Sequence, residues 1–388
     1  MHGGYDWRMK RLAALAVCIL VAGCGHGPLA GRDGIFADDL FGPRPAGVGA
    51  KGVFAVSEPM RQYIDAEMAG PLAVRGLNRG LIDELYRKNG LRLEYDAAVT
   101  RNAAEAFEAR SGNCLSLVIM TAAFAKALGL DVRYQAAFID PAWSRVGGMH
   151  FLSGHINLVL VGKSTGRRTL YDAGEHLMVD FLPGEDLRGL RTWPIPEETV
   201  VAMYLNNRAA ESLAKGQLRD AYWWARAAIG EAPTFLSAYN TLAVVYLRNG
   251  NWPHAERVLR AVLELEPGNA PALSNLLLAL QRQGRVAESE MLQRKLARLE
   301  PYPAFYFLDR GLSAMRLGDF KAARQLFAKE VERDPYYHES HFWLGVANVQ
   351  LGNLEEARKH LDLALEHSTT RNERELYTAK LERIRSYR

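Results

Sequence analysis

The sequence predicts an α+β domain followed by an all-α repeat solenoid. Between residues 56 and 200, helical runs precede runs in which apolar and polar residues alternate, and helices followed by an antiparallel sheet are typical of α+β domains. From residue 201 to 370, glycines and prolines recur at a fixed step, which is typical of stacked helical repeats. A chain of 388 residues with 48% hydrophobic and 24% charged residues can fill two or three ordinary globular domains.

The charge of the chain bears on its partners. The formal net charge is only +4, and basic and acidic residues are interspersed. Because no basic patch stands out, we expect no nucleic-acid partner. We also expect no cofactor.

Residues 1–24 are predicted to be a targeting segment. A basic Met9-Lys10-Arg11 precedes an apolar stretch, residues 12–22, that is too short for a stable transmembrane helix. The stretch ends in Leu20-Val21-Ala22-Gly23-Cys24, which resembles the lipobox of bacterial lipoproteins. This resemblance implies cleavage of the segment and lipidation of Cys24 as the first mature residue. We expect a lipid-anchored protein of the cell envelope, in the outer membrane and facing the periplasm; an ordinary secretory signal is the alternative.

Residues 25–55 are rich in glycine, proline and alanine without a sustained period, so we expect a flexible tether there.

Cysteine usage is also informative. Cys18 lies in the cleaved segment and Cys24 carries the lipid, which leaves Cys114 as the one cysteine of the mature soluble part. A lone cysteine cannot form an intramolecular disulfide, so Cys114 is either an inert buried residue or a reactive thiol.

Cap residues and apolar periods define the elements of the middle domain, residues 56–200. Helices are expected over residues 57–68, 72–89 and 100–109, and from Cys114 to a stop at Gly129. Extended runs are expected over residues 91–95, 132–138, 155–161, 168–172 and 176–182.

Cys114 occupies the first turn of the predicted helix. Ser111, Gly112 and Asn113 are cap and turn residues, and an apolar run of helical period follows at once. The unpaired backbone N–H groups and the positive end of the helix dipole favour a thiolate over a thiol at this position.

A nucleophilic thiolate needs a base and an orienting carboxylate. His155 is the candidate base, and Asp172 and Asp180 are the candidate carboxylates, since each ends an extended run that follows His155. Asp172 precedes Ala-Gly and is also suited to opening a turn. Asp180 lies inside an apolar run, where a carboxylate is partly buried and needs a partner. We prefer Asp180 and keep Asp172 as the alternative.

Gly112-Asn113-Cys114, at the start of a helix that ends in Ala127-Leu-Gly-Leu-Asp-Val-Arg133, resembles the core of transglutaminase-like, papain-related domains. The resemblance covers residues 100–182. It implies Cys114 as nucleophile, His155 as base and later acid, and an aspartate that holds the imidazole tautomer. Backbone N–H groups at the helix start, including that of Cys114, are candidate oxyanion donors. An aromatic residue usually follows the histidine closely in that superfamily, whereas Ile156-Asn157-Leu158 follows here, so the substrate cannot be carried over.

Two further histidines bear on whether the chain binds a metal. His150 and His176, together with His155, could imitate a set of metal ligands, but their spacing is not that of a compact site. We therefore predict no metal and expect both to be surface or loop residues.

The second half of the chain has a period of 34 residues. Glycines keep this step at Gly216, Gly250, Gly284, Gly318 and Gly352, and prolines keep it at Pro233, Pro267, Pro301 and Pro335. This is the tetratricopeptide signature, in which glycine takes the turn within a helix pair and proline ends the second helix. We expect five repeats over residues 201–370 and a capping helix over residues 371–388.

Such arrays usually offer a concave face to a protein or peptide partner. Candidate aromatic residues for this face are Tyr204, Tyr222, Trp223, Trp224, Tyr239, Tyr336, Tyr337, Phe342 and Trp343. The alternative is that most of them form the core between helices.

Two functions follow from these patterns. The first is a membrane-anchored periplasmic cysteine hydrolase or acyl transferase, acting on peptide or amide bonds through a thioester, whose repeats recruit a protein or peptide. The alternative is a non-catalytic lipoprotein scaffold that uses its repeats for protein–protein interaction.

Overall fold

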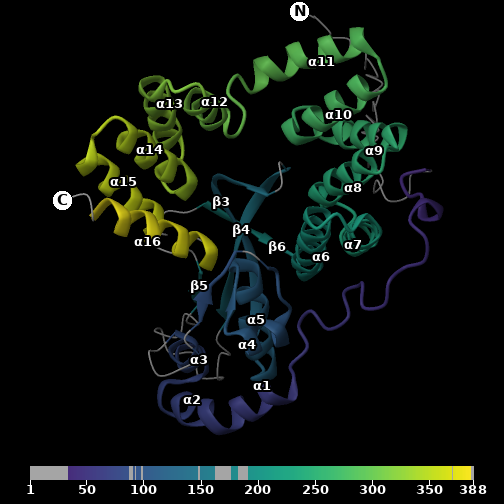
Figure 1. Ribbon diagram of the computed structural model, residues 1–388. Helices are drawn as coiled ribbons and strands as arrows, with labels where there is room; N and C mark the ends of the chain where they lie inside the picture. Colours follow the sequence, from purple (N-terminus) through teal and green to yellow (C-terminus); the bar gives the residue numbers. More distant parts are fainter. Residues whose placement is uncertain are drawn as a thin grey trace, which may run out of the picture.

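The computed structural model describes residues 34–86, 91, 93–97, 99–146, 149–161, 176–181, 191–368 and 370–385. The predicted targeting segment with Cys24, the first part of the predicted tether, and Asp172 with its extended run lie outside the described residues. Figure 1 shows a lower lobe built from α1 to α5 and a sheet, above which the helices α6 to α16 curve round from one side of the molecule to the other.

The lower lobe begins with short helices. They are α1 (Glu58–Tyr63), η3 (Ile64–Met68), α2 (Ala69–Arg75), α3 (Leu77–Tyr86), α4 (Ala103–Ala109) and α5 (Cys114–Ala127). The helix that we expected to end at Met68 continues to Arg75, and Gly76 with a φ of 78° then separates it from α3. Two short strands, β1 (Glu94–Tyr95) and β2 (Ser111–Gly112), pair in parallel just before α5.

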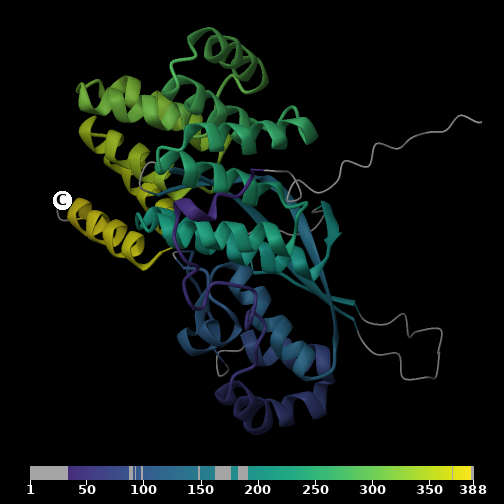
Figure 2. The ribbon, with the colours of Figure 1, turned by 90° about the vertical axis from the view of Figure 1, so that its right-hand side faces the viewer.

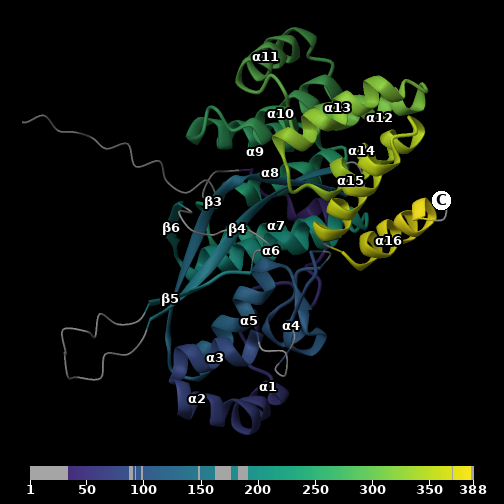
Figure 3. The same ribbon diagram turned by 90° about the vertical axis from the view of Figure 1, so that its left-hand side faces the viewer.

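A four-stranded antiparallel sheet packs against α5 (Figure 3). Its strands are β3 (Asp131–Val146), β4 (Met149–Val161), β5 (His176–Val179) and β6 (Arg191–Ile195), in the order β5-β4-β3-β6. β3 and β4 are longer than the alternating runs predicted, and β6 was not predicted. α5 contacts β3 and β4 on one side and α3, α4 and α6 on others. Every residue of α5 from Leu115 to Ala125 is therefore buried.

The second half forms five helix pairs and a final helix. The pairs are α6 (Glu197–Ala214) with α7 (Leu218–Glu231), α8 (Leu236–Arg248) with α9 (Trp252–Leu265), α10 (Ala270–Arg282) with α11 (Val286–Leu299), α12 (Tyr306–Arg316) with α13 (Phe320–Arg333), and α14 (His338–Gln350) with α15 (Leu354–Glu366); α16 (Arg371–Arg385) follows. The five periodic glycines have φ between 71° and 77°, a left-handed backbone conformation that residues with side chains rarely adopt. The array starts at Glu197, slightly before the predicted boundary at residue 201.

The prediction of a free tether is wrong for residues 34–55, which we call the N-terminal strap. Figure 2 shows this segment lying against the first helix pairs of the array, and it contains a short helix, η2 (Asp38–Leu40). Phe41 is 6% exposed and its ring stacks on Tyr222 of α7, with centroids 4.1 Å apart. The Tyr246 hydroxyl donates to the carbonyl of Ile35 at 2.9 Å. Scattered apolar residues thus anchor a segment whose composition resembles that of a linker.

The candidate aromatic residues of the array mostly serve as core. Tyr222 and Tyr239 are fully buried, Tyr204 is nearly so, and Tyr336 is the exposed exception at 55%. Within the described part of the chain, no helix combines the length and the hydropathy that crossing a bilayer requires.

Candidate active site

Cys114 is the first residue of α5 and is partly exposed, whereas the residues from Leu115 to Ala125 are buried. The residue before it, Asn113, has extended backbone angles and caps the helix, because its side-chain oxygen accepts a hydrogen bond from the Ser116 backbone N–H at 2.9 Å.

His155 lies on β4 opposite Ala137 of β3 and is 8% exposed. Its Nε2 atom lies 2.7 Å and 2.8 Å from the two carboxylate oxygens of Asp180. Asp180 directly follows β5, which pairs with β4 through Leu158 and Val179. The sheet register therefore brings together a histidine and an aspartate that are 25 residues apart.

The side chain of Cys114 lies close enough to the imidazole of His155 to raise its pKa, through hydrogen bonding and through charge. Since Nε2 contacts Asp180, Nδ1 is the nitrogen left for the thiol. Burial alone would lower the pKa of His155, but the hydrogen bonds to Asp180 and Cys114 and the charges of both raise it to about 9. At neutral pH the imidazole is therefore a cation placed between two groups that can carry negative charge.

The sequence did not reveal two neighbours of this site. Asn157 is 1% exposed and donates from Nδ2 to the Asp180 carboxylate at 3.2 Å. Because His155 and Asn157 are two apart on β4, they share one face of the sheet, and this alternation was the available signal. Asn157 belongs to the tripeptide in which we had noted only a missing aromatic residue.

Tyr95 is the second unforeseen neighbour. Its position on β1 lies opposite Gly112 of β2, two residues before Cys114. Burial, the largest effect, and the nearby Cys114 side chain raise the pKa of the Tyr95 phenol, and the Cys114 backbone partly offsets this rise. The Tyr95 hydroxyl therefore lies beside the start of α5, where we expected the oxyanion donors.

Asp172 and two histidines are the other predicted site residues. Asp172 is outside the described residues, and among those that are described the structure brings together Cys114, His155 and Asp180. His176 is an exposed residue at the start of β5, and the side chain of His150 is not described. Among the residues that the structure covers, no cluster of three or more histidine, cysteine or acidic side chains is arranged to hold a metal ion.

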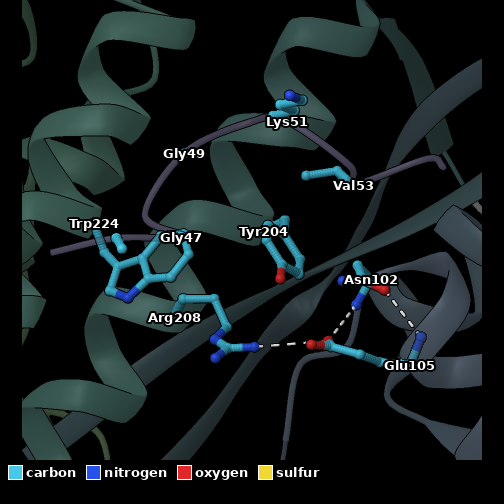
Figure 4. Close-up of a pocket in the computed structure, with 10 residues that line it drawn as sticks. Gly47, Gly49, Lys51, Val53, Asn102, Glu105, Tyr204, Arg208 and Trp224 are labelled. Carbon is cyan, nitrogen blue, oxygen red and sulfur yellow. Dashed lines mark hydrogen bonds and ion pairs between the residues drawn. The ribbon is translucent and has the colours of Figure 1, made fainter.

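A separate cavity of about 260 Å³ lies where the N-terminal strap, α4 and the first two array helices meet. Figure 4 shows Arg208 of α6 reaching across it toward Glu105 of α4, at 3.7 Å. The same guanidinium lies 5.4 Å from the ring centre of Trp224. Charged and aromatic side chains thus line the junction between the lobe that carries Cys114 and the helical array.

Comparison with known proteins supports the assignment of the array. Residues 240–303 and 308–371 match the family model described as tetratricopeptide repeat, which confirms tetratricopeptide repeats in this part of the chain. The match does not include the segment that carries Cys114. No curated protein matches the sequence.

Solved structures of tetratricopeptide repeat proteins resemble part of the chain. A thermophilic one from Thermus thermophilus is 20% identical, covers 46% of this chain and 98% of its own length, and has a TM-score of 0.30. YrrB, a repeat protein with an unusual peptide-binding site, is 19% identical over 46% of this chain and 92% of its own, with a TM-score of 0.25. The pilF protein of Pseudomonas aeruginosa is 19% identical over 49% and 87%, with a TM-score of 0.29.

Proposed function

We propose that this chain binds a protein or peptide through its repeat array and carries out acyl transfer at Cys114, as a transglutaminase-like cysteine hydrolase or acyl transferase. The observation that carries the catalytic part is the position of His155, whose Nε2 atom lies 2.7 Å from Asp180 and whose pKa is raised by the neighbouring Cys114 side chain. The binding part is supported by the match to tetratricopeptide repeats, a class of array that usually binds other proteins.

In the proposed reaction, the Cys114 thiolate attacks the carbonyl carbon of an amide, and the His155 imidazolium donates its proton to the departing amine. The thioester that remains is then attacked by water or by a second amine, which loses its proton to His155, and the Cys114 thiolate departs. Water gives a carboxylic acid and an amine gives a new amide, so the same three side chains serve hydrolysis and transfer. Asp180 keeps the imidazole in one orientation and stabilises its positive charge.

The place of this chemistry belongs to the same proposal. Lipidation of Cys24 would anchor the chain in the cell envelope, at the outer membrane and facing the periplasm. The N-terminal strap limits how far the array can lie from the lipid anchor, because the Gly34 carbonyl accepts a hydrogen bond from Arg257 of α9 at 2.8 Å. The roughly ten residues from Cys24 to Gly34 reach at most about 35 Å. The array would then lie close to the membrane instead of standing off from it.

Alkylation of Cys114 tests the catalytic part. The label at Cys114 is quantified by peptide mass spectrometry, so that Cys18 and Cys24 do not interfere. Cys114 of the wild type should react with iodoacetamide at pH 6 to 7 at least about tenfold faster than a short peptide thiol, because an adjacent imidazolium favours the thiolate. His155→Ala should remove this advantage. A wild-type rate equal to that of the peptide would exclude the enzymatic function.

The alternative function is a non-catalytic lipoprotein scaffold, and the comparisons back it more directly, because the family match lies within the repeats alone. A pull-down from an envelope fraction with wild type and Cys114→Ala separates the two. A scaffold keeps the same partners in both, whereas an enzyme also gives a covalent, thiol-sensitive adduct with the wild type only.

A further inference from the structure

We call the lower lobe that carries Cys114 the cysteine lobe. One of its residues hydrogen-bonds to α6, the first helix of the array, through its backbone N–H, its hydroxyl and its carbonyl. This residue is Thr100, which is 1% exposed. Its backbone N–H donates to Glu211 at 2.6 Å, its hydroxyl accepts from Asn207 Nδ2 at 3.2 Å, and its carbonyl accepts from Arg208 at 3.4 Å. Glu211 is four residues after Asn207 and three after Arg208, so its side chain is a neighbour of both on the surface of α6.

The same Thr100 hydroxyl reaches the residue before the cysteine. It accepts a second hydrogen bond from Asn113 Nδ2 at 2.9 Å. The side-chain oxygen of Asn113 is then fixed by Ser116, whose backbone N–H and hydroxyl donate to it at 2.9 Å and 2.7 Å. The Ser116 hydroxyl in turn accepts from the Arg101 N–H at 2.9 Å. Donor and acceptor of the Asn113 amide are both engaged, so its orientation is set by the loop that α6 holds.

The orientation of Asn113 governs the position of the sulfur. A helix N-cap fixes the backbone of the first turn, and Cys114 is the first residue of that turn. Misplacing a reacting group by about 1 Å can cost about a hundredfold in rate. We therefore propose that Thr100 is a positioning residue for Cys114, and that Asn207 and Glu211 make the repeat array part of the apparatus that orients the thiol. This role rests on the proposed reactivity of Cys114.

A purely structural role for Thr100 would change stability but leave the reactivity of the folded protein unchanged. The contact between the two lobes does not depend on the hydroxyl alone, because Arg208 also pairs with Glu105 across the cavity (Figure 4). Removal of the hydroxyl should therefore leave the lobes joined and release mainly the Asn113 side chain.

The test uses the full chain and the rate of iodoacetamide labelling at Cys114 between pH 5 and pH 9. Thr100→Val removes only the hydroxyl and should lower the labelling rate at pH 6 to 7 by about tenfold, with a changed pH profile. Thr100→Ser keeps the hydroxyl and should restore the rate. Thr121→Val is the matched control, because the hydroxyl of this fully buried α5 residue has no hydrogen-bond partner, and this variant should label like the wild type.

Asn207→Ala removes the donor that α6 supplies to the Thr100 hydroxyl, and it should lower the labelling rate of Cys114 by a smaller factor than Thr100→Val. If hydrogen exchange shows that Thr100→Val unfolds α5, the labelling rate of Asn207→Ala tests the proposal in its place. The proposal is overturned if folded Thr100→Val labels like the wild type, if Thr121→Val slows as much, or if Asn207→Ala has no effect. A wild-type Cys114 no faster than a peptide thiol would instead refute the proposed function, and the positioning role with it.

Discussion

Replacing Asp180 by asparagine should remove the negative charge that raises the pKa of His155. In the wild type, burial lowers the pKa of His155, but the contacts with Asp180 and Cys114 outweigh burial and raise the pKa from 6.5 to about 9. The Asp180 carboxylate is 3% exposed, so solvent does little to screen the pair. Asp180→Asn keeps the shape and an acceptor oxygen but removes the charge, so the pKa of His155 should fall back toward 6.5 or below.

The sign of the stability effect follows from linkage. Because the folded pKa of His155 lies above its unfolded value, the stabilisation is present below pH 6.5 and disappears as the pH rises through about 9. At one pKa unit per 1.36 kcal/mol, the stabilisation lost in Asp180→Asn is about 3 kcal/mol at pH 6 and close to zero at pH 10.

Two measurements check this prediction. Hydrogen exchange of the buried amides of α5 and β4 should give a free-energy difference between wild type and Asp180→Asn that shrinks from pH 6 to pH 10. The imidazole resonances of His155 in NMR titrations should move to a lower pKa in the variant. A difference in stability that is the same at both pH values, or an unchanged His155 pKa, would refute the role assigned to this pair.

Three further predictions concern the rest of the chain. Gly250→Ala should cost roughly 1 kcal/mol in denaturant unfolding because Gly250 has a φ of 77°, whereas Gly268→Ala, in open space without a positive φ, should be neutral. Phe41→Ala should weaken the packing of the N-terminal strap by about 3 kcal/mol and speed proteolysis within residues 34–55. Burial lowers the pKa values of His341 and His360, whose Nδ1 atoms are 3.1 Å apart, so the stability they confer should be lost as the pH falls below 6.5. Lower protection factors for the amides of α14–α16 at pH 5 than at pH 7, after correction for the slower intrinsic exchange at pH 5, are the expected sign.

Local patterns carried the predictions that needed only neighbouring residues. The 34-residue step of glycines is visible in the sequence because each turn repeats the same backbone requirement. The helix start at Cys114 is visible because Asn113 is a favoured cap residue. The preference for Asp180 over Asp172 came from its apolar surroundings; Asp180 follows an edge strand with exposed residues, but its own side chain is 3% exposed and lies beside His155.

Contacts between distant segments had no signal in the sequence. Tyr95 lies in a two-residue strand and Thr100 in a loop, and nothing local indicates that they lie near Cys114. The N-terminal strap was interpreted as a tether because its apolar residues have no period. Their partners, such as Tyr222, are about 180 residues away in the chain, and a composition argument cannot find them.

The even period of the repeats also conceals a break in their packing. The core of the cysteine lobe runs without interruption into the first repeats and reaches Leu280 of α10, whereas α12–α14 and α14–α16 form hydrophobic clusters of their own. Of the residues of α11, only Ser289 is buried, while Met291 is 66% exposed, and Phe305 before α12 has a φ of 62° that side chains rarely adopt. A 34-residue step fixes the turn within each helix pair but not the stacking of one pair on the next. The array therefore consists of a first part that shares a core with the cysteine lobe and a second part held mainly by its own contacts. A partner that binds the first part contacts helices that share a core with the lobe of Cys114, whereas one that binds the second part is separated from that core by the break.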